Sequence, residues 1–125
     1  MFLILLAATA TAISATPDRL YSATFRTCSR NAGGVTVAIR DCTSAEYHRL
    51  DAKLNQRYKS LMRSLPKAKA NALRLSERRW LAERKRTCDV AGKEEAGGTL
   101  ETLMIDSCYL ESLAGRVDLL KAMQR

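Results

Sequence analysis

An apolar side chain recurs every three or four positions between residues 47 and 65, and this pattern restricts the fold more than any other feature. The members of the stripe are Tyr47, Leu50, Leu54, Tyr58, Leu61 and Leu65. Such spacing places side chains on one face of an α-helix, whereas a half-buried strand would alternate apolar and polar residues. Pro66 disfavours helical geometry at the residue before it. The pattern therefore predicts a helix from about Thr43 to about Ser64.

Two further helices are expected after this proline, which itself suits the first turn of a helix. The second should run from about Pro66 to Cys88, with Trp80 as an anchor of the core. Its expected inward residues are Leu73, Glu77, Trp80, Leu81, Arg84 and Cys88. Residues 89–98 contain three glycines and predict a loop, after which Thr99 can cap a third helix to about Met123. The expected inward residues of the third helix are Leu100, Leu103, Leu110, Leu113, Val117 and Leu120.

The segment before the first of these helices is weakly patterned. Val35, Val37 and Ile39 alternate as in a short strand, but Thr36 is also a suitable cap for a helix that begins there. A single strand would have no partner, which favours the helix. Because short connections between successive helices favour antiparallel packing, we predict an all-α, three-helix antiparallel bundle stapled by disulfides.

The N-terminus resembles a secretory signal. Residues 2–8 form a short apolar run, followed by the small-x-small pattern of Ala10-Thr11-Ala12. The run is far shorter than the roughly 20 residues needed to span a bilayer, and no transmembrane span is expected elsewhere. We predict a signal peptide over residues 1–15, cut after Ala12 or Ala15, and a single periplasmic or secreted helical domain over residues 16–125. The alternative is an N-terminal apolar strand or anchor.

The four cysteines agree with export. Cys28, Cys42, Cys88 and Cys108 form an even set in a short chain, which predicts a disulfide framework. Sequence leaves all three connectivities open, and on count alone a four-thiolate zinc site is the alternative. None of the cysteines has C-x-x-C spacing, and the single histidine, His48, excludes a zinc site with two imidazoles. We therefore expect no metal and no cofactor, with His48 on the surface.

Catalytic motifs are missing as well. The chain has no Gly-rich phosphate loop, no H-E-x-x-H and no G-x-S-x-G. Glu94 and Glu95 are adjacent carboxylates, but neighbours on a Gly-flanked loop are a poor acid/base pair. The sequence thus indicates a binding protein and not an enzyme.

Positive charge is concentrated in the second predicted helix. The chain has 21 Lys and Arg against 13 Asp and Glu, a net charge of +8. Residues 66–92 carry eight basic and three acidic groups, whereas residues from 93 onward carry four and six. The basic residues expected on the outward side are Lys67, Arg74, Arg78, Arg79, Lys85 and Arg86. This stripe is either a solvated face or a site for anionic lipid or wall polymer. No aromatic residues interleave with it, which argues against nucleic acid as a partner.

Polar residues also invite a pairing between the first two helices. Arg84 lies on the inward stripe of the second helix and Asp51 lies beside that of the first, in the half of the hairpin distant from Pro66. A bidentate Asp51–Arg84 bond, with Asn55 one turn further in the same polar network, would lock the helices together.

Several landmarks in order resemble the LprI/YecT-like family, named after a mycobacterial lysozyme-inhibitor lipoprotein. They are Cys42, Tyr47, Asp51, Leu54-Asn55, Tyr58, Leu61, Leu73, the W-x-x-x-R-x-x-x-C run of Trp80, Arg84 and Cys88, Gly97-Gly98-Thr99, Cys108 and Arg116. The resemblance covers about Thr27 to Leu120. It implies a helical, disulfide-bonded exported fold that binds lysozyme or another envelope protein stoichiometrically.

This chain departs from the family pattern at Glu77, where Gln is usual, at Lys85, where an acidic residue is usual, and at Leu113, where Thr is frequent. The changes make the second helix more basic. Because animal lysozymes are themselves basic, long-range repulsion would slow their association with a +8 chain. The acidic residues available for local contact are Glu94, Glu95, Glu101, Asp106 and Glu111.

Overall fold

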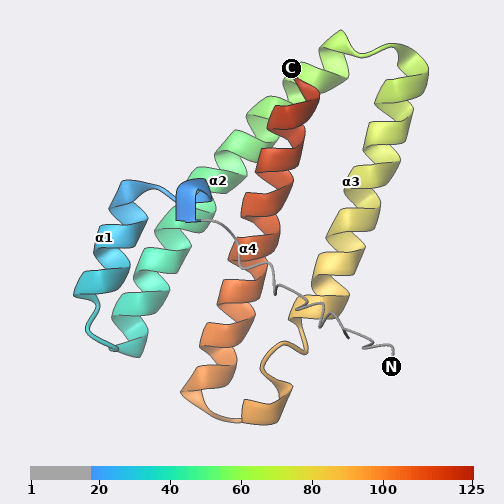
Figure 1. Cartoon of the computed structure of the whole chain (residues 1–125). Coiled ribbons are helices and arrows are strands. Elements are labelled where there is room, and N and C mark those ends of the chain that lie inside the picture. The colour runs from blue at the N-terminus through green and yellow to red at the C-terminus, as the bar shows by residue number, and fades with distance from the viewer. Residues whose placement is uncertain (1–17) are drawn as a thin grey trace, which may run out of the picture.

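The computed structural model describes residues 18–125, and these residues form helices joined by short connections (Figure 1). The elements are the 3-10 helix η1 (Asp18–Leu20), α1 (Ala23–Asn31), α2 (Thr36–Ser64), α3 (Lys67–Cys88), the 3-10 helix η2 (Lys93–Glu95) and α4 (Thr99–Met123). The all-α prediction is confirmed, and residues 18–125 contain no strand. The predicted signal peptide and its cuts after Ala12 or Ala15 lie outside the described residues.

The three long helices run up, down and up, so that α3 is antiparallel to both α2 and α4 (Figure 1). α2 and α4 point the same way and share the largest helix–helix contact. α1 forms a hairpin with the first half of α2 and makes a fourth helix that the pattern did not predict. The expectation of three helices is therefore incomplete. The alternating residues near Thr36 belong to α2, which confirms the helix over the strand.

The hydrophobic core lies between α2 and α4. Its members are Leu50, Leu54, Leu61, Leu73, Leu110, Leu113, Ala114, Val117 and Leu120. Leu113 and Leu120 are 0% exposed, and both come from α4. Complete burial of a leucine side chain stabilises the fold by about 1.5 to 3 kcal/mol. The leucine stripes of α2 and α4 therefore supply most of the driving force for folding.

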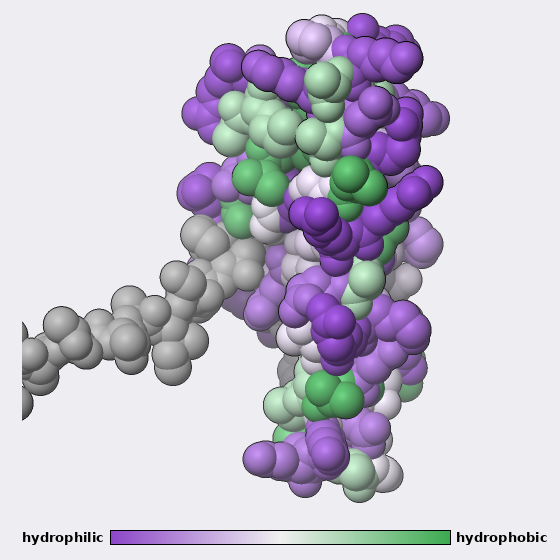
Figure 2. Space-filling view, turned by 90° about the vertical axis from the view of Figure 1, so that its right-hand side faces the viewer, coloured by the Kyte–Doolittle hydropathy of each residue, from purple (hydrophilic) through white to green (hydrophobic). Residues whose placement is uncertain are grey.

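α3 sits at the side of this pair and buries little. Ala70, Leu73 and Cys88 are its buried residues. Leu81, predicted to point inward, is 44% exposed, and Leu100 at the start of α4 is 49% exposed. Both predictions were wrong because α3 contacts its neighbours along a narrow edge and α4 begins beyond the end of the core. Figure 2 shows that the face around α3 is mostly hydrophilic, with separate hydrophobic spots.

Glycine and proline form the connections between helices. Gly33 and Gly34, between α1 and α2, have φ of 59° and 77°, in the left-handed region where glycine alone is unstrained. The connection between α2 and α3 consists of Leu65, the C-cap of α2, and Pro66, the N-cap of α3. Gly92 permits the 89–98 connection to approach α4, since a Cβ there would lie 2.7 Å from Glu101 Cα. The chain can therefore reverse within a few residues at each point.

Two disulfides tie the helices together. Cys28 of α1 bonds Cys42 of α2, and Cys88 at the end of α3 bonds Cys108 of α4. Their Cα–Cα distances are 5.7 Å and 5.4 Å, within the normal range for a disulfide. All four cysteines are therefore used, which selects one of the three connectivities and leaves no thiolate for a zinc site.

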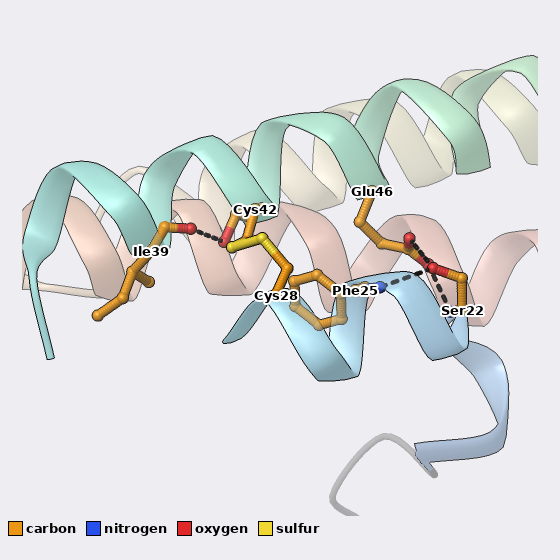
Figure 3. The surroundings of a disulfide bond; sticks show 7 residues. Ser22, Phe25, Cys28, Ile39, Cys42 and Glu46 are labelled. Carbon is orange, nitrogen blue, oxygen red and sulfur yellow. Dashed lines mark hydrogen bonds between the residues drawn. A yellow bond between two sulfur atoms is a disulfide. The ribbon is translucent and has the colours of Figure 1, made fainter. Parts of the chain in front are cut away.

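A buried carboxylate holds the start of α1 against α2 (Figure 3). Glu46, only 3% exposed, accepts hydrogen bonds from Ser22 N at 2.9 Å and Ser22 Oγ at 2.7 Å. Ser22 Oγ in turn accepts from Phe25 N and caps α1. Arg49 forms an ion pair with Glu46 one turn along α2. Burial alone would raise the pKa of Glu46, but the hydrogen bonds from Arg49 and Ser22 outweigh it and lower the pKa.

Candidate functional site

A guanidinium surrounded by aromatic rings lies where α2, α3 and α4 meet. Arg84 Cζ is 4.5 Å from the ring centre of Trp80, 5.2 Å from that of Tyr109 and 6.0 Å from that of Tyr47. Arg84 Nη1 also donates a hydrogen bond of 3.0 Å to Tyr47 Oη. We call these four residues the Arg84 cluster. Cation–π attraction lets α3 attach to both neighbours without a large apolar surface.

The predicted Asp51–Arg84 bond is not among the hydrogen bonds or ion pairs of residues 18–125. The antiparallel register of α2 and α3 places Arg84 opposite Tyr47, one turn before Asp51, so the tyrosine hydroxyl takes the guanidinium. Arg84 Nε is buried and is the one such side-chain atom in the described chain without a hydrogen-bond partner. The positive charge of Arg84 is thus met by rings and a neutral hydroxyl.

Asp51 and Asn55 nevertheless lie close to Arg84, in a groove between α2 and α3. The groove has a volume of about 280 Å³, and Trp80 and Leu54 also line it. Asp51 is half-buried and Asn55 is exposed. The structure therefore brings the three predicted residues to one groove without joining them in a bonded network.

The buried ion pair between helices is formed by residues that were not predicted to meet. Arg116 of α4 donates from Nε to Glu77 Oε2 of α3 at 2.9 Å and from Nη2 to Ser76 Oγ at 3.0 Å. Its side chain is 6% exposed and that of Glu77 is 14% exposed. Trp80 donates from Nε1 to Ser112 Oγ at 2.9 Å and packs against the core. The sequence signal that pointed toward this ion pair was Glu77, an acidic residue on the inward stripe of α3.

The C-terminal end of α3 holds a chain of three polar groups. Lys85 Nζ donates to Asp89 Oδ2 and Tyr109 Oη donates to Asp89 Oδ1, both at 2.6 Å. These two hydrogen bonds lower the pKa of Asp89. The bond to Asp89 in turn raises the pKa of Lys85 and, together with burial, that of Tyr109. Tyr109 is therefore a neutral donor with its hydroxyl fixed toward α3.

A larger groove lies on the other side of Tyr47, between the N-terminal halves of α2 and α4. It has a volume of about 480 Å³. Its lining residues are Val37, Arg40, Asp41, Thr43, Ser44, Tyr47, Asp106 and Tyr109. Arg40 Nε donates to Asp106 Oδ2 at 2.8 Å across the two helices. We call it the α2–α4 groove. It was not predicted from the sequence, because the nearest residues of its two walls, Tyr47 and Asp106, are far apart in the chain.

The basic residues predicted for α3 are all exposed. They are Lys67, Arg74, Arg78, Arg79, Lys85 and Arg86, and we call them the basic face. Within residues 18–125, three of them make no hydrogen bond or ion pair with another side chain, namely Lys67, Arg78 and Arg79. The other three contact neighbouring side chains on or just after α3. Arg74 contacts Asn71, Lys85 contacts Asp89 and Arg86 contacts Glu83.

Of the acidic residues predicted as contacts for a basic enzyme, some are exposed on the surface and others already have a partner within the protein. Glu94, Glu95 and Glu111 are exposed. Glu101 Oε2 accepts from Gly97 N at 2.6 Å, and Asp106 is paired with Arg40. Three of the five residues therefore remain available on the surface.

No cluster of metal ligands and no membrane-spanning helix occurs in the part of the chain that the structure describes. Residues 18–125 contain no group of three His, Cys, Asp or Glu side chains that could hold a metal ion. None of the helices in this range is both long and apolar enough to cross a bilayer. His48 is exposed on α2.

The family model described as lysozyme inhibitor LprI matches residues 28–120. This span includes all four cysteines, α2 and α3 entire, and α4 as far as Leu120, the last residue of its core. The chain belongs to the LprI family. The predicted resemblance to this family is thereby confirmed. Trp80 and Arg84 of the W-x-x-x-R-x-x-x-C run form half of the Arg84 cluster.

One curated relative of this LprI-family chain is an uncharacterised protein of Rhizobium meliloti (strain 1021). The two are 25% identical over 95 residues, which cover 66% of this chain and 68% of the relative. No solved structure matches this member.

Proposed function

We propose that this LprI-family member is an exported envelope protein that inhibits a lysozyme-type enzyme by stoichiometric binding and performs no chemistry of its own. The observation that carries the proposal is the match to the lysozyme-inhibitor family from Cys28 to Leu120. That match includes both disulfides and the helices that build the core, so the chain shares a whole scaffold with the family and not a short motif.

Export to the periplasm or the medium is part of this proposal. Disulfides persist in oxidising compartments and are rare in reducing ones. Both disulfides join helices of the same small domain, and residues 1–15 supply the proposed signal peptide, cut after Ala12 or Ala15. Residues 16–125 would then be the mature inhibitor.

A titration of lysozyme with the oxidised protein tests inhibition. Lysis of cell walls should slow in proportion to added protein and reach its limit near a one-to-one ratio, at low and at high salt. The same titration with a small soluble chromogenic substrate should give the same stoichiometry, because the enzyme itself is covered. Full lysozyme activity on both substrates at a large molar excess would contradict the proposal.

A second candidate function rests on the basic face. Arg78 and Arg79 are exposed and have no side-chain partner within residues 18–125, so their charge is available to an anionic lipid or wall polymer. Binding of this kind weakens steeply with salt. Replacing Arg78 and Arg79 together by Glu should then abolish sedimentation with anionic vesicles.

The matched control for this charge reversal is on α2. Lys53 and Lys59 are also exposed, and their joint replacement by Glu changes the net charge equally. Equal loss of vesicle binding in both double variants would mean that overall charge, and not the basic face, controls the association.

A further inference from the structure

We propose that the α2–α4 groove binds a neutral, hydroxyl-rich ligand, namely a short stretch of wall glycan. This site goes beyond lysozyme inhibition and does not rest on it. The chemistry of the lining, the way in which its two tyrosines are held, and the sign of its charge support this ligand.

The lining combines the groups that suit a saccharide. Asp41 and Asp106 supply carboxylate acceptors, and Arg40 supplies a guanidinium with several donors. Thr43 and Ser44 add hydroxyls that can donate or accept. A hydroxyl-rich ring presents donors and acceptors around its whole edge, so it needs such a mixed wall. A purely apolar ligand would leave these groups without water or partners.

The two tyrosines of the groove are fixed from the α3 side. Tyr109 Oη donates to Asp89, and Tyr47 Oη accepts from Arg84 of α3. Both rings line the groove while their hydroxyls are tied to residues at or near the end of α3, outside the groove lining. Tyr47 keeps its own hydroxyl proton for a further acceptor. The groove thus has two rings whose apolar surfaces are available for the C–H faces of a sugar and which need little reordering on binding.

The charge of the groove distinguishes its ligand from that of the basic face. One cation, Arg40, faces two anions, Asp41 and Asp106, and Arg40 is already paired with Asp106 at 2.8 Å. The lining itself thus carries net negative charge, which disfavours a phosphate or a carboxylate, and the positive Arg84 lies outside the lining against the two tyrosine rings. The volume of about 480 Å³ is within the range of small-molecule sites. A neutral glycan fits both the charge and the size.

The test is an NMR titration of the oxidised, isotope-labelled protein with the trimer of N-acetylglucosamine, which is neutral. Amide shifts should be confined to residues 37–47 and 106–109. The Tyr109→Ala variant, which removes one ring, and Asp106→Ala, which removes an acceptor, should each weaken binding about tenfold or more. Tyr109→Phe keeps the ring but loses the bond to Asp89 that holds it, so it should weaken binding less than Tyr109→Ala does.

Glu111→Ala is the matched control, since it removes an exposed carboxylate from the same helix outside the groove. It should bind the trimer as the unaltered protein does. Thermal unfolding of each variant shows whether lost binding reflects lost structure, and Asp106→Ala tests the groove if Tyr109→Ala unfolds. The proposal is overturned if the trimer shifts no amides, if the shifts lie on α3, if Glu111→Ala weakens binding equally, or if a polyphosphate shifts the groove residues instead.

The NMR titration and the lysozyme assay together distinguish failure of this glycan site from failure of the proposed lysozyme inhibition. A protein that inhibits lysozyme on a small soluble substrate but ignores the trimer would retain the first proposal and lose the second. If the protein binds the trimer and leaves lysozyme active on that substrate, the glycan site is retained and the proposed inhibition is contradicted.

Discussion

α3 and α4 are neighbours joined by a disulfide, but they are attached to the fold in different ways. α4 contributes six buried residues, among them the fully buried Leu113 and Leu120. α3 buries three, and its other contacts are an ion pair, cation–π contacts and the bond from Trp80 to Ser112. Apolar burial therefore makes α2 and α4 the stable centre. Directional polar contacts position α3 and leave its outer side free to carry the basic face.

The largest expected effect comes from a core leucine. Leu113→Ala should lower the free energy of unfolding by about 3 to 5 kcal/mol, since it opens a cavity where exposure is 0%. The same truncation on α3, Leu81→Ala, should change it by less than about 0.5 kcal/mol because Leu81 is 44% exposed. Urea denaturation measures both. Similar losses of unfolding free energy in the two variants would mean that α3 depends on apolar burial as much as α4 does.

The disulfide between the two helices is the next test. Replacing Cys88 and Cys108 by Ser should cost about 3 kcal/mol, given a sequence separation of 20 residues. Because α3 buries little, hydrogen exchange should then quicken mainly in its last turns, while α2 and α4 stay protected. The control replaces Cys28 and Cys42, which should loosen α1 and spare α3. Uniform loss of protection along all helices would contradict the comparison.

The ion pair of α3 with α4 should give a smaller loss. Arg116→Ala removes the partner of Glu77, which is only 14% exposed, and should cost about 2 to 3 kcal/mol. Adding Glu77→Gln should recover part of this cost, because a neutral amide is cheaper to leave unpaired. Arg40→Ala breaks a solvent-exposed pair and should cost less than about 1 kcal/mol. Chemical denaturation of the unaltered protein, the two single variants and the double variant measures these free energies of unfolding.

The last effect concerns α1 and is a change of stability with pH. The pKa of Glu46 is lowered, so its contribution is complete above its ordinary value of 4.5 and is lost as pH falls through the folded value. The difference in unfolding free energy between the unaltered protein and Glu46→Gln should therefore be constant near neutral pH and shrink below about pH 4.5. A difference that does not change with pH would mean that the carboxylate is not ionised against Arg49.

Helices with a continuous apolar stripe could be predicted from the sequence, and polar contacts could not. The stripe from Tyr47 to Leu65 and the break at Pro66 correctly placed the end of α2 and the start of α3, but α2 begins at Thr36 and not near Thr43. α1 lacks a buried residue of its own, and what holds it are Cys42 and Glu46, which are far away in the sequence. The nine residues of α1 were too few for an apolar stripe of the length that identified the longer helices.

The polar partners were missed because they depend on the register between helices. A shift of one turn along α2 decides whether Arg84 meets Asp51 or Tyr47, and helical periodicity treats the two positions alike. The pair of Arg116 with Glu77 depends on two faces whose mutual rotation only packing determines. Prediction of the α2–α4 groove likewise requires the register and rotation of the two helices, so its two walls could not be brought together from the sequence.

The positions of the disulfides decide what a protease in the surrounding medium could do. The connection between α1 and α2 lies inside the ring closed by Cys28 and Cys42, and the 89–98 connection lies inside the ring closed by Cys88 and Cys108. A cut in either would leave the fragments covalently joined, as one band on a non-reducing gel. Among the connections between the α-helices of residues 18–125, only the turn at Leu65 and Pro66 lies outside both rings, and it is very short. Each connection between these α-helices is thus either bridged by a disulfide or very short.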